Sequence, residues 1–308
     1  MKQLKKYWVQ FNKFNGFCRV ITRLVTSIIQ NDFYGRAAEM GFMLVLGIFP
    51  FMLFLMAIFG WMGNKSYMDP ILQFLSNLMP QQAMDLILTV LSEVMIFEHG
   101  GEMAVIGLIV TIILSTNSVA VILKGLNTAY NVTETRNFVY TRILAFIMFV
   151  IFTLILFLSI NLIIFGKIII TFAVNHLNLS HIGSIALMTL RWPIAFLALY
   201  LMAFLSYYIL PDLKGNEKFK RTSALPGSLF FCIFWLLGSW GFSVYVNNLR
   251  TYNFVYGIIG AFIVLMVWLY YTSILLLIGG EINSQTYNKL NRKAEEIKED
   301  FENLKQFG

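Results

Sequence analysis

The sequence predicts an all-α membrane protein with six transmembrane helices, an outer amphipathic helical hairpin and amphipathic cytoplasmic terminal helices. Three observations support this fold class. The chain is 58% hydrophobic and only 13% charged, whereas soluble domains carry about 25% charged residues. Apolar stretches long enough to cross a hydrocarbon core of about 30 Å recur along the whole chain. The lysines and arginines concentrate in alternate connections between these stretches, as they do in membrane proteins.

Residues 1–35 are predicted to form a basic amphipathic N-terminal helix. Apolar side chains recur at alternating steps of four and three residues from Tyr7 to Ile28, and basic residues such as Lys13 and Arg19 fall between them. A basic helix with an aromatic stripe is typical of a helix that lies on anionic lipid. Packing of this stripe against the helical bundle is the alternative.

The membrane domain is predicted to occupy residues 36–283. Its last span is the clearest, because residues 257–280 contain no charged side chain and would form a helix of about 36 Å. The apolar character of the third span continues past Lys167 to Val174, which predicts a helix that projects beyond the membrane. The predicted spans cover about residues 40–63, 103–123, 143–166, 192–210, 222–246 and 257–280.

Residues 66–98 are predicted to form the outer helical hairpin. Asp69 and Pro70 are typical of a helix start, with the aspartate as N-cap and the proline in the first turn. Two apolar stripes follow, separated at Pro80, and each is too short to span the bilayer. The hairpin contains almost no lysine or arginine, which favours the outer side of the membrane.

The distribution of basic residues predicts the orientation. Of the 23 lysines and arginines, all but Lys65, Lys167, Arg191 and Arg250 lie on the side of the spans that carries both termini. By the positive-inside rule, both termini are therefore cytoplasmic.

Residues 284–308 are predicted to form a charged cytoplasmic C-terminal helix. Its apolar residues alternate at steps of three and four: Tyr287, Leu290, Ala294, Ile297, Phe301 and Leu304. This stripe could join two copies of the chain in a homo-oligomer or pack against residues 4–28, and the sequence leaves both options open.

Four stretches of this sequence resemble the YihY/BrkB family of bacterial six-span inner-membrane proteins. They are LGIFPFMLFLMAIFG (46–60), LNTAYNV (126–132), YYILPDLKGNEKFKRTSALPGSLF (207–230) and the segment 252–284 through GGEIN. The sequence departs from the family pattern at Gly47, where a small polar serine is common, and at the start Glu39–Met40–Gly41. The resemblance implies a multi-pass protein of the bacterial inner membrane. It also brings the labels ribonuclease BN and serum-resistance virulence factor, and some relatives are linked to lipid transport.

The residues do not favour an enzyme. A metal-dependent nuclease needs clustered carboxylates or histidines, but the three histidines, His99, His176 and His181, have no ligand-like spacing. Metal-binding motifs, phosphate-binding loops and paired cysteine motifs are absent from the sequence. We therefore predict no catalytic residue, no cofactor, no metal and no nucleic-acid partner.

The predicted topology instead brings eight polar or charged residues to the cytoplasmic ends of the spans. If they converge, they form a basic vestibule for an anionic lipid, with two carboxylates inside it. The lead hypothesis is a transporter or flippase-like protein, and the alternative is a non-transporting scaffold or envelope-integrity factor. Charged side chains at helix ends also commonly reach to the interface without any such role. The candidate residues are Arg36, Glu39, Asn117, Lys124, Arg142, Lys220, Arg221 and Glu281.

Overall fold

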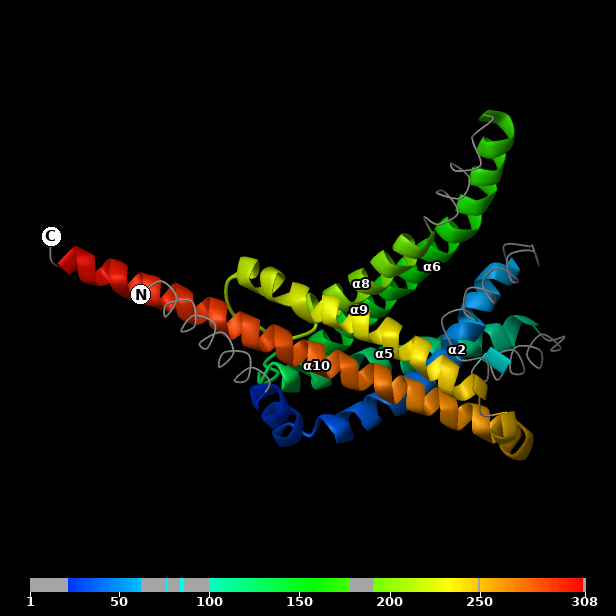
Figure 1. Ribbon diagram of the computed structural model, residues 1–308, viewed down its shortest axis with the longest axis horizontal. Helices are drawn as coiled ribbons and strands as arrows, with labels where there is room; N and C mark the ends of the chain where they lie inside the picture. Colours follow the sequence, from blue (N-terminus) through cyan, green and yellow to red (C-terminus); the bar gives the residue numbers. More distant parts are fainter. Residues whose placement is uncertain are drawn as a thin grey trace, which may run out of the picture.

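The computed structural model describes residues 22–61, 76, 84–85, 100–177, 191–248 and 250–306. The described residues are helices and short connections, without a strand, so the predicted all-α class is confirmed. Residues 22–30 are helical and precede a turn. The longer helices are α2 (Phe33–Trp61), α5 (Gly100–Ala129), α6 (Phe138–Leu177), α8 (Arg191–Ile209), α9 (Glu217–Asn248) and α10 (Arg250–Gln306), as drawn in Figure 1.

Four helical segments in the described residues are long and apolar enough to cross a membrane: Leu108–Ala129, Phe138–Ser159, Glu217–Val244 and Phe262–Glu299. They correspond to the second, third, fifth and sixth predicted spans. Pro193–Ile209 is an apolar helix of shorter length at the fourth predicted span, and α2 covers most of the first. A membrane-embedded helical protein is therefore supported, while the number of six spans stays a prediction.

Two long helices extend beyond the predicted spans. α6 continues past Lys167 to Leu177, so the predicted continuation of this helix is confirmed, while its projection beyond the membrane stays a prediction. α10 runs without a break from Arg250 to Gln306, so residues 284–306 continue the last span instead of forming a separate helix. Of the predicted hairpin, only Ser76, Met84 and Asp85 are described, and residues 1–21 lie outside the described part of the chain.

Successive helices alternate in direction, so that one end of the bundle gathers most of the connections between described helices. Residues 22–36, 130–137 and 210–216 meet at this end, which we call the loop end, and the last part of α10, beyond Tyr287, projects past it (Figure 1). α10 packs against α9 and α2, α2 packs against α5, and α8 packs against α9 and α6. The alternation agrees with the antiparallel order that the predicted spans require.

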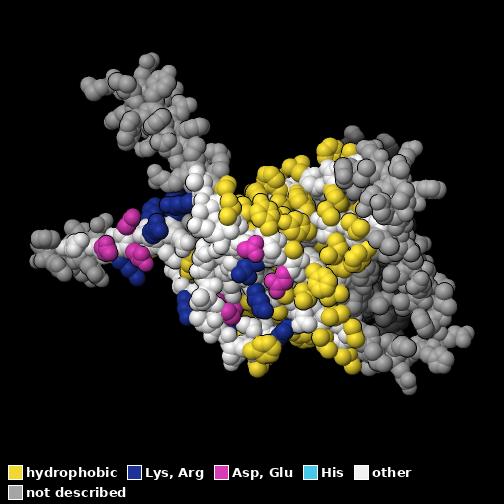
Figure 2. Space-filling model, turned by 90° about the horizontal axis from the view of Figure 1, so that it is seen from below, with side chains coloured by type: hydrophobic (Ala, Val, Ile, Leu, Met, Phe, Trp, Pro, Cys, Tyr) yellow, Lys and Arg dark blue, Asp and Glu magenta, His cyan; other side chains and the backbone are white. Residues whose placement is uncertain are grey.

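The buried core contains both apolar and small polar side chains. Met40, Leu126, Tyr207 and Leu277 are at most 1% exposed. By contrast, many large apolar side chains on α5, α6 and α9 face outward, and Leu158 and Trp240 are 63% and 71% exposed. Figure 2 shows such apolar side chains over much of one face of the molecule. An outward apolar surface of this kind is stable in lipid and not in water.

The departure from the family pattern at Gly47 has a physical counterpart in the α2–α5 contact. A Cβ atom on Gly47 would lie 2.6 Å from the Ser118 hydroxyl. That hydroxyl donates a hydrogen bond to the carbonyl oxygen of Met43 at 2.6 Å. The small polar group at this contact is therefore supplied by α5, and glycine on α2 leaves the space that it occupies.

Candidate functional site

The eight candidate residues come from five helices. Most of them lie in the helical turns next to the loop end, whereas Asn117 lies about three turns before the end of α5. Within the described part of the chain, one hydrogen bond joins two of the eight, and it links Arg142 to Asn117. The residues are Arg36 and Glu39 on α2, Asn117 and Lys124 on α5, Arg142 on α6, Lys220 and Arg221 on α9, and Glu281 on α10.

Several of the candidates have local partners or face outward. The Arg36 guanidinium donates to the carbonyl oxygen of Asn31 at 3.2 Å and so stabilises the turn before α2. The Lys220 ammonium forms an ion pair with Glu217 at 2.7 Å. Glu39, Lys124 and Arg221 are exposed. The structure therefore gathers these groups at one end of the bundle without joining them in a single contact network.

Arg142 differs from the other candidate cations because a neutral side chain holds it. Its guanidinium donates a hydrogen bond to the Asn117 side-chain oxygen and lies 5.1 Å from the centroid of the Phe138 ring. Among the described residues, no Asp or Glu oxygen lies within 4 Å of Arg142. The positive charge of Arg142 is therefore oriented by its neighbours but not neutralised by them.

Glu281 is the most deeply buried of the eight, with 4% of its surface exposed. The Gln285 amide donates to its Oε1 atom at 2.9 Å, and the Ser27 hydroxyl also faces this carboxyl group. Oε2 has no hydrogen-bond partner within the described chain. Since a buried polar atom without a hydrogen bond is costly, this carboxyl group is held at an energetic cost beneath the helix of residues 22–30.

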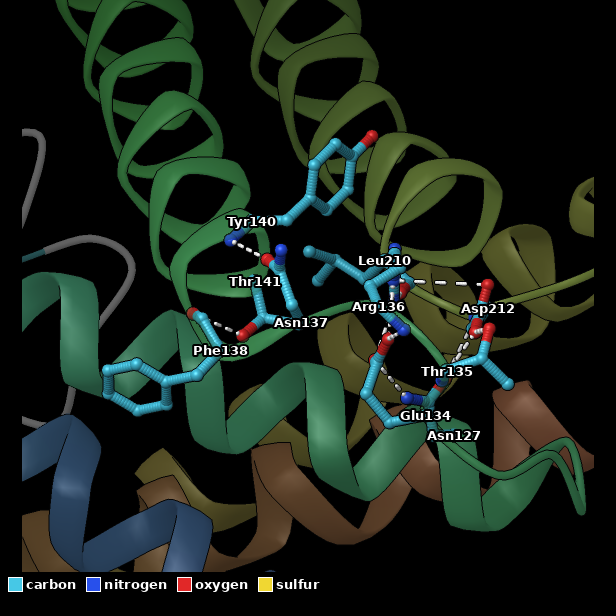
Figure 3. Close-up of polar contacts among 10 residues, drawn as sticks. All are labelled: Asn127, Glu134, Thr135, Arg136, Asn137, Phe138, Tyr140, Thr141, Leu210 and Asp212. Carbon is cyan, nitrogen blue, oxygen red and sulfur yellow. Dashed lines mark hydrogen bonds and ion pairs between the residues drawn. The ribbon is translucent and has the colours of Figure 1, made fainter.

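The structure also reveals a set of charged contacts that the sequence analysis did not single out. Arg136 Nε lies 2.6 Å from Glu134 Oε1 and 3.9 Å from Asp212 Oδ1. Its Nη2 atom donates to Glu134 Oε2 and to the carbonyl oxygen of Leu210, both at 2.7 Å. Arg136 thus joins the loop between α5 and α6 to the loop between α8 and α9 (Figure 3).

Neutral groups complete these contacts. The backbone N–H and the hydroxyl of Thr135 donate to Asp212 Oδ2 at 2.8 and 2.6 Å. The Asn127 side chain donates to Glu134 at 2.7 Å and accepts from the backbone N–H of Asp212 at 2.9 Å. We call Asn127, Glu134, Thr135, Arg136 and Asp212 the loop clamp, because together they fix two connections at the loop end (Figure 3).

Contacts within the loop clamp lower the pKa of its two carboxyl groups, Glu134 and Asp212. Partial burial alone would raise the pKa of Glu134, but hydrogen bonds from Arg136 and Asn127 outweigh it and lower the pKa. Burial opposes the shift at Asp212 as well, and the hydrogen bonds from Thr135 together with the charge of Arg136 lower its pKa. Both carboxyl groups are therefore ionised and neutralised by a fixed partner.

A second polar cluster lies in the core beneath the loop clamp. The Asn283 side-chain oxygen accepts from the backbone N–H of Gly227 at 2.6 Å, and its amide donates to the carbonyl oxygen of Ala224 at 3.3 Å. Pro226 lies inside α9, and proline removes a backbone donor from a helix interior. Asn283 therefore bonds to α9 backbone groups in the turn that the proline interrupts.

Two tyrosines extend this cluster to α5 and α8. The Tyr130 hydroxyl donates to the carbonyl oxygen of Tyr207 at 3.4 Å and also faces the Asn283 side chain. The Tyr207 hydroxyl donates to the carbonyl oxygen of Leu276 at 2.9 Å. We call Tyr130, Tyr207, Gly227, Gly279 and Asn283 the polar junction, which joins α5, α8, α9 and α10 in the core.

Two positions of the polar junction, Gly227 and Gly279, leave no room for a side chain. A Cβ atom on Gly227 would overlap the carbonyl oxygen of Gly279, and one on Gly279 would overlap the Tyr207 hydroxyl. Elsewhere on α9, a Cβ atom on Gly241 would meet nothing within 4 Å. At Gly227 and Gly279 the backbones of α9 and α10 therefore approach each other closely, whereas Gly238 of α9 lies against the Tyr271 side chain of α10.

Three of the four stretches that carry the family resemblance meet in these two clusters. Residues 126–132 supply Asn127 and Tyr130, residues 207–230 supply Tyr207, Asp212 and Gly227, and residues 252–284 supply Gly279 and Asn283. For these missed residues the signal was thus present in the sequence as polar and glycine positions within those stretches, whereas Glu134, Thr135 and Arg136 lie outside them.

No metal centre is apparent in the described part of the chain, where no three His, Cys, Asp or Glu side chains are placed to hold an ion. The side chains of His99, His176 and His181 lie outside the described residues. The predictions of no metal and no catalytic residue therefore stay predictions.

A family model covers most of the sequence: the model described as virulence factor BrkB matches residues 24–303. A ribonuclease-like protein, YfkH, of Bacillus subtilis (strain 168) is 28% identical over 254 residues, which are 82% of this chain and 90% of that protein. A UPF0761 membrane protein of Cronobacter sakazakii is 29% identical over 121 residues, or 36% of this chain and 42% of the relative.

A further relative, UPF0761 membrane protein YihY of Salmonella newport, is 28% identical over 102 residues, or 32% of this chain and 35% of the relative. No solved structure matches the chain.

Proposed function

The chain belongs to the virulence factor BrkB family, and from this premise we propose that it is a membrane protein that binds and moves an anionic lipid. The proposal places it in the bacterial inner membrane with both termini in the cytoplasm, where the loop end faces anionic headgroups. The four apolar helices support membrane embedding, and the placement of lysine and arginine supports this orientation.

The gathering of cations at the loop end is the observation that carries the proposal. Arg36, Arg142 and Lys220 lie in the first turns of three different helices that begin at this end. Exposed apolar side chains of α6 and α9 follow within one or two turns. A cationic rim next to a lipid-facing surface attracts anionic headgroups and contacts their acyl chains as well.

Lipid movement can be measured by reconstituting the full chain into vesicles with fluorescent phosphatidylglycerol or phosphatidylcholine and quenching the outer leaflet. The wild-type protein is expected to expose inner-leaflet phosphatidylglycerol to the quencher faster than phosphatidylcholine. A double variant, Lys220→Ala with Arg221→Ala, should slow the anionic lipid several-fold, because each basic residue near a surface contributes about 1 kcal/mol of attraction.

The matched control removes two positive charges from the projecting part of α10, by Lys293→Ala with Lys298→Ala. Both lysines are exposed and lie beyond the loop end, so scrambling should equal that of the wild type. A wild-type protein that moves no lipid of any tested class would end the transport proposal, as would equal losses in the two double variants.

One observation favours a second candidate function, a non-transporting scaffold. The last part of α10, beyond Tyr287, projects past the loop end (Figure 1), and Ile297 on its apolar stripe is 51% exposed. This stripe could join a second copy of the chain. A scaffold would form a homo-oligomer that dissociates on Ile297→Asp, measured as the mass of the detergent-solubilised protein, and would move no lipid.

The name ribonuclease-like belongs to the Bacillus relative. For this chain we propose no enzymatic activity, because its sequence contains none of the nuclease or nucleotide-binding motifs examined above. Purified protein that cleaves RNA in the presence of added divalent metal would contradict this part of the proposal.

A further inference from the structure

We propose that Arg142, oriented by Asn117 and Phe138, binds the phosphate of an anionic membrane phospholipid. This inference rests on the proposed function for the source of its ligand and identifies where the headgroup is held. The contacts of Arg142, its position on α6 and the surface around it each point to this ligand.

The contacts of Arg142 orient its charge without cancelling it. The neutral Asn117 oxygen accepts one guanidinium hydrogen bond, and the ring of Phe138 lies beneath the guanidinium at 5.1 Å. An arginine has five N–H donors in a planar fork, and a phosphate can accept two of them at once. Because Asn117 and Phe138 are both neutral and contact one side of the Arg142 guanidinium, its remaining N–H groups can donate hydrogen bonds to an anion.

The position of Arg142 places those donors at headgroup depth. The apolar span of α6 begins at Phe138, and Arg142 follows about 6 Å along the helix axis. Beside it, Phe138 and Ile143 are 71% and 54% exposed. A lipid whose acyl chains contact these side chains would bring its phosphate to the level that the long arginine side chain reaches.

A second cation lies on the same side of α5. Lys124 follows Asn117 by seven residues, which is close to two full helical turns and about 10 Å along the axis. Its side chain is exposed. Lys124 therefore adds positive potential near the headgroup, while Arg142 supplies the oriented donors.

The other arginine near this end of α6, Arg136, is neutralised by carboxylates of the protein itself. Arg136 precedes Arg142 by six residues and lies against Glu134 and Asp212. Among the described residues, no carboxylate forms an ion pair with Arg142. At headgroup depth a positive charge without a protein counter-ion attracts anionic lipid, and a lipid phosphate is the counter-ion that the surroundings provide.

The test measures equilibrium binding of phosphatidylglycerol to the full chain in detergent by native mass spectrometry. Arg142→Ala should weaken binding about tenfold or more, because a charge-assisted pair is lost. Asn117→Ala should weaken it less, because the charge remains and only its orientation is released. Arg142→Gln, which retains donors but no charge, should resemble Arg142→Ala, and circular dichroism should show all three variants folded.

Arg292→Ala is the matched control, because Arg292 is an exposed arginine on the projecting part of α10. It removes the same charge and should bind phosphatidylglycerol like the wild type. Folded Arg142 variants that bind as tightly as the wild type would overturn the site. Competition by millimolar inorganic phosphate as effective as that by the lipid would also overturn it, since the ligand would then be the free ion.

The same variants in the vesicle assay separate this inference from the proposed function. Binding that depends on Arg142 in a protein that moves no lipid would support the site and contradict transport. Scrambling by the wild type together with unchanged binding and scrambling in Arg142→Ala would contradict the site and leave transport standing.

Discussion

Arg136 and Arg142 are the same residue type, lie six positions apart and belong to the same end of the bundle, yet their surroundings differ completely. Arg136 is paired with Glu134 and Asp212 and also bonds to the carbonyl oxygen of Leu210. Arg142 has Asn117 and Phe138 as partners. The fold thus uses one arginine to join two connections and leaves the charge of the other available.

Charge alone therefore does not identify a functional cation in a membrane protein. Neutralised groups such as the loop clamp hold the scaffold in place, and their removal should change stability. An oriented but unneutralised group should affect ligand binding with little effect on stability. Variants of the loop clamp and the polar junction should therefore change stability, and variants of Arg142 should change lipid binding.

The largest effect is expected in the polar junction. Gly227→Ala should destabilise the protein by about 3 kcal/mol, because the added Cβ would overlap the carbonyl oxygen of Gly279 in a tightly packed contact. Gly241→Ala on the same helix is the control, since its Cβ meets nothing within 4 Å, and it should be neutral or gain up to about 1 kcal/mol from helix propensity. Thermal unfolding in detergent measures both, and equal melting temperatures would contradict the described helix contact.

A smaller loss is expected in the loop clamp. Asp212→Ala removes the acceptor for two Thr135 donors and one of the carboxylates beside Arg136. Since hydrogen bonds to a charged group contribute about 1.5–3 kcal/mol, we expect a loss of about 2 kcal/mol in the unfolding free energy. Glu295→Ala, at an exposed carboxylate of α10 outside the clamp, should leave the melting temperature unchanged.

The loop clamp should also make stability depend on pH. The folded state lowers the pKa of both Glu134 and Asp212. Their contribution is therefore complete above the ordinary carboxyl pKa of about 4 and is lost as the pH falls through the lowered values. The melting temperature should stay level from pH 7 to about 5 and fall below about 4. Arg136→Ala should reduce that acid-induced drop, and an unchanged drop would assign it to other groups.

The smallest effect is expected at Glu281. Glu281→Gln keeps the size of the side chain and an oxygen that can accept from Gln285, and it removes a charge whose Oε2 has no described partner. Stability should stay the same or rise by up to about 1 kcal/mol. A melting temperature several degrees lower would mean that the ionised carboxylate itself holds the helix of residues 22–30.

Much of the fold could be predicted because each apolar segment carries its own signal. Residues 257–280 lack any charge, and α10 covers them. The continuation of α6 past Lys167 followed from the same kind of local pattern. The unbroken course of α10 across residue 283 was harder to predict, because a change from apolar to charged composition does not itself end a helix.

The candidate site was harder to predict because its contacts join distant parts of the sequence. Asn283 and Gly227 are neutral and lie 56 positions apart, so neither charge nor spacing connects them. Arg136 and Asp212 were visible as charges, but their pairing depends on two connections meeting at the loop end. Asn117 and Arg142 were both singled out from the sequence, while their direct contact required the packing of α6 across α5.

The most direct measurement compares Arg136→Ala with Arg142→Ala by two quantities, the melting temperature in detergent and the Kd for phosphatidylglycerol. We expect Arg136→Ala to lose about 2–3 kcal/mol of stability and to bind the lipid nearly as the wild type does while it is folded. We expect Arg142→Ala to melt close to the wild type and to bind about tenfold more weakly. The opposite pattern, or two variants that change both quantities equally, would contradict the distinction between a neutralised and an available arginine.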